Sequence, residues 1–114
     1  MESYSQKQLI SRVNRQKALV FIATARNKKI KVKTVQFTGI KTIQWLYIKK
    51  EMTFSWEFVC LQGKAVFYLV RNKELFPLIL EEGKKEKTIT LPPGWVRLRI
   101  AGEHASCQLE LNRY

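Results

Sequence analysis

The chain has 114 residues, with 21 lysines and arginines against nine acidic residues and a formal net charge of +12 at pH 7. This length predicts a single domain, and a hydrophobic content of 46% excludes a wholly disordered chain. No apolar run approaches the roughly 20 residues of a membrane-spanning helix, so the sequence predicts no transmembrane segment.

The positive charge lies mainly in the first half of the chain. Residues 1–50 carry twelve lysines and arginines and one acidic residue, whereas residues 51–114 carry nine basic and eight acidic residues. A block of one charge attracts polyanions such as nucleic acid, acidic lipid headgroups or acidic polymers. The alternative is a solvated surface in a protein from a lysine-rich proteome, and a charge confined to one half fits that alternative less well.

We divide the chain into a basic N-terminal segment, residues 1–25, and a β-domain, residues 26–114. Apolar side chains at helical spacing predict a short amphipathic helix over residues 5–17. The apolar run at residues 18–25 then suits a buried strand. This run also has the outline of a signal peptide, because basic residues precede it and its end resembles a cleavage site. Its apolar core is too short for a signal peptide, so secretion remains the alternative.

The β-domain begins with a stretch of alternating lysines. Residues 26–33, RNKKIKVK, hold five cationic side chains in eight residues. In a strand, Lys29, Lys31 and Lys33 share one face, with neighbours roughly 6.6–6.8 Å apart. The next residues on that face, Val35 and Phe37, are apolar. The lysine end therefore either projects past the sheet or is followed by a bulge near residue 34 that rotates the chain.

Two interpretations of these lysines stay open. Lysines on an exposed edge strand block aggregation between sheets, and lysines on a sheet face bind polyanions. Basic residues elsewhere in the first half tip the balance toward binding. The predicted polyanion-binding residues are Arg12, Arg15, Lys17, Arg26, Lys28, Lys29, Lys31 and Lys33.

The rest of the chain is a succession of short segments rich in β-branched and aromatic residues. These predicted strands are residues 41–48, 52–60, 64–71, 87–91, 95–101 and 106–112. Turn signals separate them at about 8–12-residue spacing, which predicts an all-β fold, an antiparallel β-sandwich or jelly roll of about eight strands. Residues 75–80 are apolar on both faces and contain Pro77, which indicates an edge or a bulge and a surface for homo-oligomerisation.

Alternation along the predicted strands assigns the three tryptophans. Trp56 belongs to the core, and Trp45 is also assigned to the core because apolar residues flank it on the same face. Trp95 is expected to be exposed, since the opposite face of its strand already carries valine, leucine and isoleucine. Trp95, Arg97 and Arg99 then form an outward face suited to stacking or anion binding.

The stretch LPPGWVRLRIAG, residues 91–102, resembles a recurrent stretch of secreted and surface β-sandwich modules. In those modules a Pro/Gly turn leads into an aromatic residue that opens a late strand. The resemblance implies a sandwich fold and no particular activity.

The sequence predicts no enzyme, no metal site and no cofactor. His104 is the one histidine, and positions 104 and 107 point to opposite faces if the strand begins near residue 105, which argues against a His104–Cys107 nucleophile pair. One histidine and two separated cysteines do not supply a metal-ligand set. Cys60 and Cys107 lie in apolar segments, which favours two buried thiols, with one disulfide as the alternative.

These observations predict a non-enzymatic binding or structural module whose basic N-terminal half engages a polyanion. Nucleic acid is the favoured ligand, as in a small phage or viral structural protein. The alternative is a surface or envelope interaction module that binds carbohydrate, protein or an acidic polymer through exposed aromatic residues. A third hypothesis is oligomerisation through the apolar edge near Pro77. A cytoplasmic location is favoured, with a secreted or envelope location as the alternative.

Overall fold

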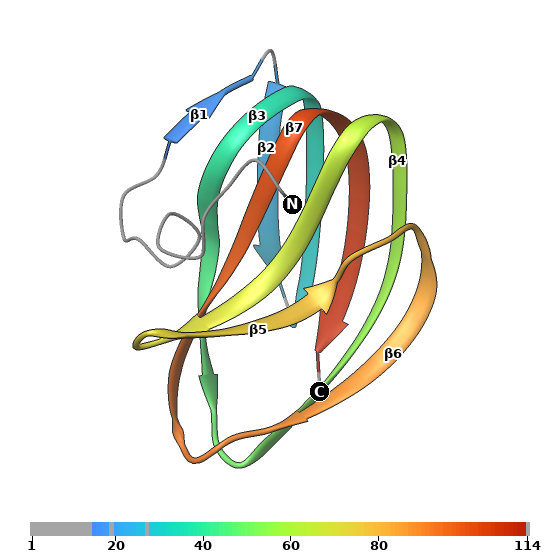
Figure 1. The fold of residues 1–114 in the computed structure, drawn as a ribbon. Coiled ribbons are helices and arrows are strands. Elements are labelled where there is room, and N and C mark those ends of the chain that lie inside the picture. The colour runs from blue at the N-terminus through green and yellow to red at the C-terminus, as the bar shows by residue number, and fades with distance from the viewer. Residues whose placement is uncertain (1–14, 19, 27, 114) are drawn as a thin grey trace.

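The computed structural model describes residues 15–18, 20–26 and 28–113, and this part of the chain is all-β. Seven antiparallel strands form one sheet (Figure 1). They are β1 (Arg15–Lys17), β2 (Val20–Arg26), β3 (Lys29–Ile48), β4 (Glu51–Arg71), β5 (Glu74–Ile79), β6 (Gly83–Thr90) and β7 (Gly94–Arg113). The strand order is β1-β3-β7-β4-β5, with β2 paired to β3 and β6 paired to β4.

The N-terminal expectations lie largely outside the described residues. Of the helix predicted over residues 5–17, the structure describes only the last three residues, and these form the strand β1 instead. Most of the run at residues 18–25 belongs to β2, whose side chains are half-buried at Val20 and Phe21 and exposed from Ile22 on. The strand is therefore confirmed, but the expectation that it is buried is wrong, because β2 lies at the edge of the sheet and, among the described strands, pairs only with β3. Within the described ranges, no helix is long and apolar enough to cross a membrane.

Three long strands replace pairs of strands that the sequence predicted separately. β3 joins the lysine stretch to residues 41–48, β4 joins residues 52–60 to 64–71, and β7 joins residues 95–101 to 106–112. The turn signals between them mark bends inside continuous strands. The expected count of about eight short strands is therefore wrong, because glycine and polar residues at a bend resemble those of a chain-reversing turn.

The bends coincide in the three long strands. The register shifts between Thr34 and Phe37 in β3 and between Cys60 and Gln62 in β4. Backbone φ angles are positive at Gln36, Gly39, Gly63 and His104. Extra residues and left-handed conformations of this kind bend a strand and increase its twist. Figure 1 shows β3, β4 and β7 arching over together, so that the sheet folds back on itself.

The bends divide the sheet into two halves that face each other. One, the β2–β6 half, contains β2, β6 and residues 29–35, 51–60 and 107–113 of the long strands. The other, the β1–β5 half, contains β1, β5 and residues 38–48, 64–71 and 94–105. Buried side chains from both halves form one cluster, and the Phe58 and Phe67 rings meet across the bend with centroids 5.3 Å apart. The shared core lies between the halves.

The structure tests the assignments of the tryptophans and of the edge. Trp56 is 6% exposed, which confirms its core position. Trp45 is 51% exposed, so its assignment to the core is wrong: a bulge between Thr42 and Gln44 resets the register, and Leu46 and Ile48 fill the core instead. The edge or bulge predicted for residues 75–80 is confirmed, since β5 ends the strand order and its register with β4 shifts beside Pro77.

Candidate polyanion interface

The lysine row, Lys29, Lys31 and Lys33, lies on the outer face of the β2–β6 half. The alternating residues Ile30 and Val32 are buried in the core, and Lys31 and Lys33 are exposed. Of the two alternatives left open for this strand, the structure shows the bulge near residue 34, since the register shifts after Thr34 and Phe37 turns into the core. Lys33 and Phe37 are an even number of residues apart and would share a face in a regular strand. The bulge between them explains why the lysine faces outward and the phenylalanine faces the core.

The strand that carries the lysine row is an interior strand. Residues 29–35 of β3 pair with β2, and residues 29–34 also pair with β7 on the other side. Both backbone edges of the row are therefore hydrogen-bonded to neighbouring strands. Lysines protect a sheet from aggregation only where backbone groups are unpaired, so edge protection does not account for this row.

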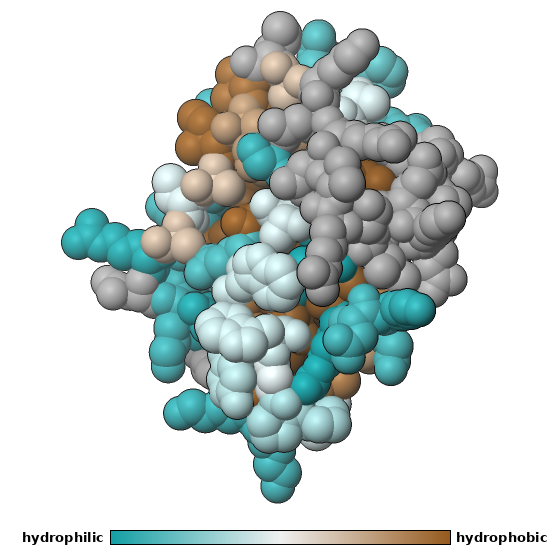
Figure 2. Space-filling model, turned by 90° about the vertical axis from the view of Figure 1, so that its left-hand side faces the viewer, coloured by the Kyte–Doolittle hydropathy of each residue, from teal (hydrophilic) through white to brown (hydrophobic). Residues whose placement is uncertain are grey.

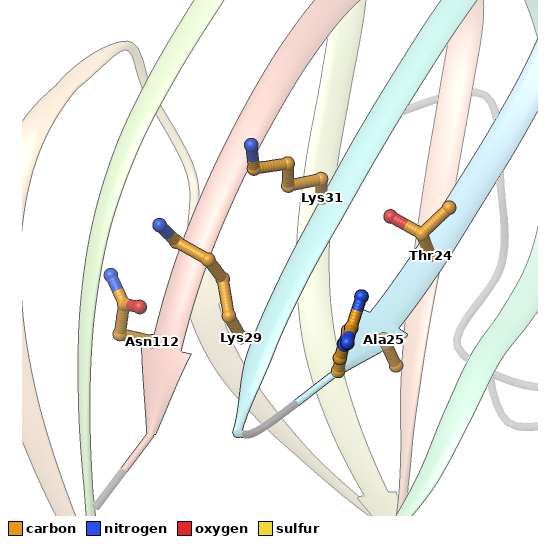
Figure 3. Close-up of a pocket in the computed structure, with 6 residues that line it drawn as sticks. Thr24, Ala25, Lys29, Lys31 and Asn112 are labelled. Carbon is orange, nitrogen blue, oxygen red and sulfur yellow. The ribbon is translucent and has the colours of Figure 1, made fainter.

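An open hollow of about 760 Å³ lies beside the row. Its lining residues are Thr24, Ala25, Arg26, Lys29, Lys31 and Asn112. Figure 3 shows Lys29 and Lys31 extending from β3 toward the side of Asn112, with Thr24 and Ala25 on β2. An adjoining hollow of about 380 Å³ shares Thr24 and Lys31 and continues to Lys33. Together the two hollows follow the lysine row along the sheet.

Glu110 of β7 is the acidic residue that contacts the row. Its Oε1 lies 2.7 Å from Lys29 Nζ, and both side chains are about half-exposed. The hydrogen bond and charge of Lys29, with a further contribution from the charge of Lys31, lower the pKa of Glu110 below its ordinary value. Within the described part of the chain, Lys31 and Lys33 form no ion pair. Their charges are therefore exposed to an incoming anion.

A smaller hollow of about 100 Å³ extends the basic surface to the end of β7. It is lined by Ala25, Arg26, Lys28, Lys29, Ile30, Gln44 and Arg113. The Arg113 amide donates a hydrogen bond to the Lys28 carbonyl oxygen at 3.0 Å, which joins the β2–β3 turn to the chain end. The Nε of Arg113 and the Oε1 of Gln44 are buried and have no hydrogen-bond partner among the described residues.

The structure brings together five of the eight residues predicted to bind a polyanion. Arg26, Lys28, Lys29, Lys31 and Lys33 lie in and beside the β2–β3 hairpin, and we call them the basic hairpin. Arg15 and Lys17 lie in β1, which pairs with residues 38–40 of β3 in the other half of the sheet. Arg12 lies outside the described residues. Sequence reasoning missed Thr24, Asn112 and Arg113, because strand register decides their neighbours.

The predicted face of Trp95, Arg97 and Arg99 is only partly accessible. Trp95 is 59% exposed, as expected, but Arg97 and Arg99 are 5% and 0% exposed. The outer side of the β1–β5 half carries a second buried cluster, which includes Tyr68, the residue opposite Arg99. Burial lowers the pKa of Arg99. The expectation that both arginines offer exposed charges beside Trp95 is therefore wrong.

His104 and the two cysteines lie in different surroundings. His104 is exposed, whereas Cys107 is buried. Cys60 and Cys107 lie opposite each other on β4 and β7, and both are free thiols. Burial raises the pKa of both thiols, which disfavours the nucleophilic thiolate. Within the described ranges, no group of three His, Cys, Asp or Glu side chains is placed to hold a metal ion.

Comparison with known protein families, with curated proteins and with solved structures found no match. Of the surfaces predicted from the sequence, the basic hairpin is the one whose charged side chains the fold gathers on an accessible face.

Proposed function

We propose that this protein is a non-enzymatic β-sandwich module that binds a polyanion through the basic hairpin, with nucleic acid as the favoured ligand. The name sandwich describes two halves of one folded sheet that share a core. The observation that carries the proposal is the position of the lysine row on an interior strand. Exposed like charges at strand spacing repel one another, and a bound polyanion relieves that repulsion.

The proposed contacts are to the phosphate backbone of the nucleic acid. The hollows along the row are lined by lysine, arginine, threonine and amide side chains, by the acidic Glu110 and by a few aliphatic residues, and no aromatic ring is among their lining residues. Base stacking needs such rings, whereas phosphate contacts position a nucleic acid without reading its sequence. We therefore expect binding that is insensitive to base sequence and strongly weakened by salt.

The test is a binding titration of the purified protein with fluorescently labelled oligonucleotides, single-stranded and duplex, between about 50 and 200 mM salt. The double variant Lys31→Gln/Lys33→Gln should weaken binding. It should also reduce the slope of log affinity against log salt by roughly 0.7–0.9 for each lost contact. Lys64→Gln/Lys73→Gln removes the same charge from two exposed lysines in the bend and in the β4–β5 turn, and it serves as the matched control.

Two results would contradict the proposal. Equal losses of affinity in the two double variants would mean that net charge, and not the lysine row, attracts the nucleic acid. An unchanged salt slope in Lys31→Gln/Lys33→Gln would mean that neither lysine contacts a phosphate. Circular dichroism of each variant checks that the fold is retained.

A further inference from the structure

Three exposed aromatic side chains form a second surface, on the outer face of the β1–β5 half. Trp45 and Tyr47 alternate along β3, and Trp95 of β7 lies directly opposite Tyr47 in the antiparallel register. The three side chains are 51%, 44% and 59% exposed, in that order. Residues on one strand face and their cross-strand partners lie on the same side of a sheet, so the rings are neighbours. We call these three residues the aromatic platform.

Contacts within the platform hold the rings in place. The Tyr47 and Trp95 rings meet edge to face, with centroids 5.3 Å apart and an interplanar angle of 69°. The guanidinium carbon of Arg97, a buried residue, lies 5.8 Å from the centre of the Trp45 ring. Such contacts favour one orientation of each ring. The platform therefore has a defined shape before any ligand arrives.

The backbone that leads into Trp95 is also fixed. Arg71 of β4 donates hydrogen bonds to the carbonyl oxygens of Pro92 and Pro93, the latter at 2.6 Å. A Cβ atom on Gly94 would overlap the Arg71 guanidinium, so a side chain at this position would require the Arg71 side chain to shift. The clamp joins the turn before β7 to a neighbouring strand. A ligand that binds to a pre-organised surface loses less conformational entropy from the protein.

The platform is not part of the shared core. Leu46, Val96 and Leu98 on the opposite face of the same strands already fill that core. Figure 2 shows the side of the molecule on which β3 ends, where residues of intermediate hydropathy gather next to hydrophilic side chains. Large aromatic side chains that remain exposed together indicate a binding site.

The position of the platform separates it from the lysine row. The two halves of the sheet face each other across the shared core, so their outer faces lie on opposite sides of the molecule. The arginines on the platform's own strand, Arg97 and Arg99, are buried. The charged residues that follow the platform in the β3–β4 turn and at the start of β4 are Lys49, Lys50 and Glu51, two cations and one anion, and all three are exposed. This frame suits a ligand that is neutral and rich in hydroxyl groups better than a row of phosphates.

We propose that the aromatic platform binds pyranose rings of a neutral polysaccharide. The face of a pyranose presents C–H groups that pack on an aromatic ring, and its hydroxyl groups project sideways to polar residues at the rim. Several rings on an open sheet face match consecutive sugar units of a chain, whereas a single small ligand needs an enclosing pocket. This site is independent of the proposed binding of polyanions.

The test is native affinity electrophoresis of the full chain in gels that contain soluble starch, xylan, galactomannan or mixed-linkage β-glucan. At least one of these should retard the protein, and added salt should leave the retardation unchanged. Trp45→Ala and Trp95→Ala should each weaken binding by about tenfold or more, which corresponds to roughly 1.4 kcal/mol. Trp95→Tyr should retain most of the binding because it keeps a ring. Leu61→Ala, which removes an exposed apolar side chain at the bend, is the matched control.

Three outcomes would overturn the inference. The first is the absence of retardation by all four polysaccharides. The second applies if circular dichroism shows that the alanine variants unfold. In that case, loss of retardation by a folded Trp95→Tyr variant would overturn the inference. The third is self-association of the wild-type protein in analytical ultracentrifugation that Trp45→Ala abolishes, because the platform would then be an interface between copies of this chain. Retention of polysaccharide binding in Lys31→Gln/Lys33→Gln would confirm that the two surfaces are separate.

Discussion

Glu110 is the single residue that most directly controls the charge of the lysine row. It forms the 2.7 Å ion pair with Lys29 and lies directly opposite Lys31. Because Lys29 lowers the pKa of Glu110, the pair adds stability at pH values above the ordinary glutamate pKa. That contribution is lost as the pH falls through the lowered pKa. At neutral pH, Glu110 is ionised and competes with an incoming polyanion for Lys29.

Replacing Glu110 with Gln should strengthen binding of nucleic acid at neutral pH. The substitution releases Lys29 for a phosphate contact, so the slope of log affinity against log salt should steepen by roughly 0.7–0.9. Anisotropy titrations at several salt concentrations measure this slope. Glu74→Gln changes the net charge equally at an exposed residue of β5, and it should leave the slope close to that of the wild type. Equal gains in both variants would rule out a specific role for Glu110.

Trp56 tests the packing of the shared core. Its side chain is buried between the halves of the sheet, and its replacement by Ala should cost about 3–5 kcal/mol of unfolding free energy, the range for large aromatic deletions in cores. Chemical denaturation monitored by far-ultraviolet circular dichroism gives this value. A loss below about 1 kcal/mol, which is typical of surface positions, would reverse the facing assigned to the first half of β4.

The bends of β3, β4 and β7 are the elements that turn one sheet into two facing halves. Gly63, in β4, has a φ of 69°. A Cβ atom at this position would overlap the carbonyl oxygens of Glu103 and His104 in β7. β4 and β7 therefore approach each other at the bend more closely than any side chain allows. His104 itself has a φ of 48°, which non-glycine residues adopt with difficulty.

Gly63→Ala should destabilise the fold by more than the roughly 1–3 kcal/mol that a strained backbone conformation costs by itself. The additional loss comes from the overlap with the backbone of β7. Gly83→Ala is the matched control, because Gly83 has a φ of 136° but no atom within 4 Å of an added Cβ. Thermal denaturation of both variants compares the effects. A melting temperature for Gly63→Ala at or above that of Gly83→Ala would mean that the bend tolerates a side chain.

At the scale of the whole molecule, the sheet is built from pairings between distant segments. β3 pairs along its length with β7, so that Lys29 lies opposite Asn112 and Ile48 lies opposite Gly94. β7, the last of the seven described strands, is inserted between β3 and β4. The central strand of the sheet thus follows the strands on both sides of it in the chain. Loop closure over such separations must precede the formation of most strand pairs.

Refolding should accordingly be slow for a domain of this size, in the range of milliseconds to seconds that is typical of folds dominated by non-local pairing. Stopped-flow dilution from denaturant, followed by tryptophan fluorescence, measures the rate. Trp56→Phe removes the tryptophan of the shared core and keeps the two exposed ones. If this variant loses most of the change in fluorescence during refolding, that change reports the formation of the core. Refolding within microseconds would contradict the non-local assembly of the sheet.

Local alternation was sufficient to predict much of this protein. The period of two along each segment assigns Trp56 to the core, Trp95 to the surface and Lys31 to the opposite side from Val32. The change from lysine to an apolar residue on one face indicated either a projecting strand end or a bulge, and the structure has the bulge, after Thr34. These features depend on residues that are adjacent in the chain, and backbone geometry alone makes side chains alternate.

The neighbours of each strand were decided only by the tertiary structure. No local pattern shows that β3 is an interior strand, that Glu110 lies opposite Lys31, or that Arg99 is buried. The position of Trp45 on the surface depends on a one-residue shift at Thr42–Gln44, and a shift of that size exchanges the two faces of a strand. The sequence by itself determined the all-β class and which side chains share a face. Which strands pair, and in which register, decided where the charges and the aromatic rings gather, because these pairings join residues that are far apart in the chain.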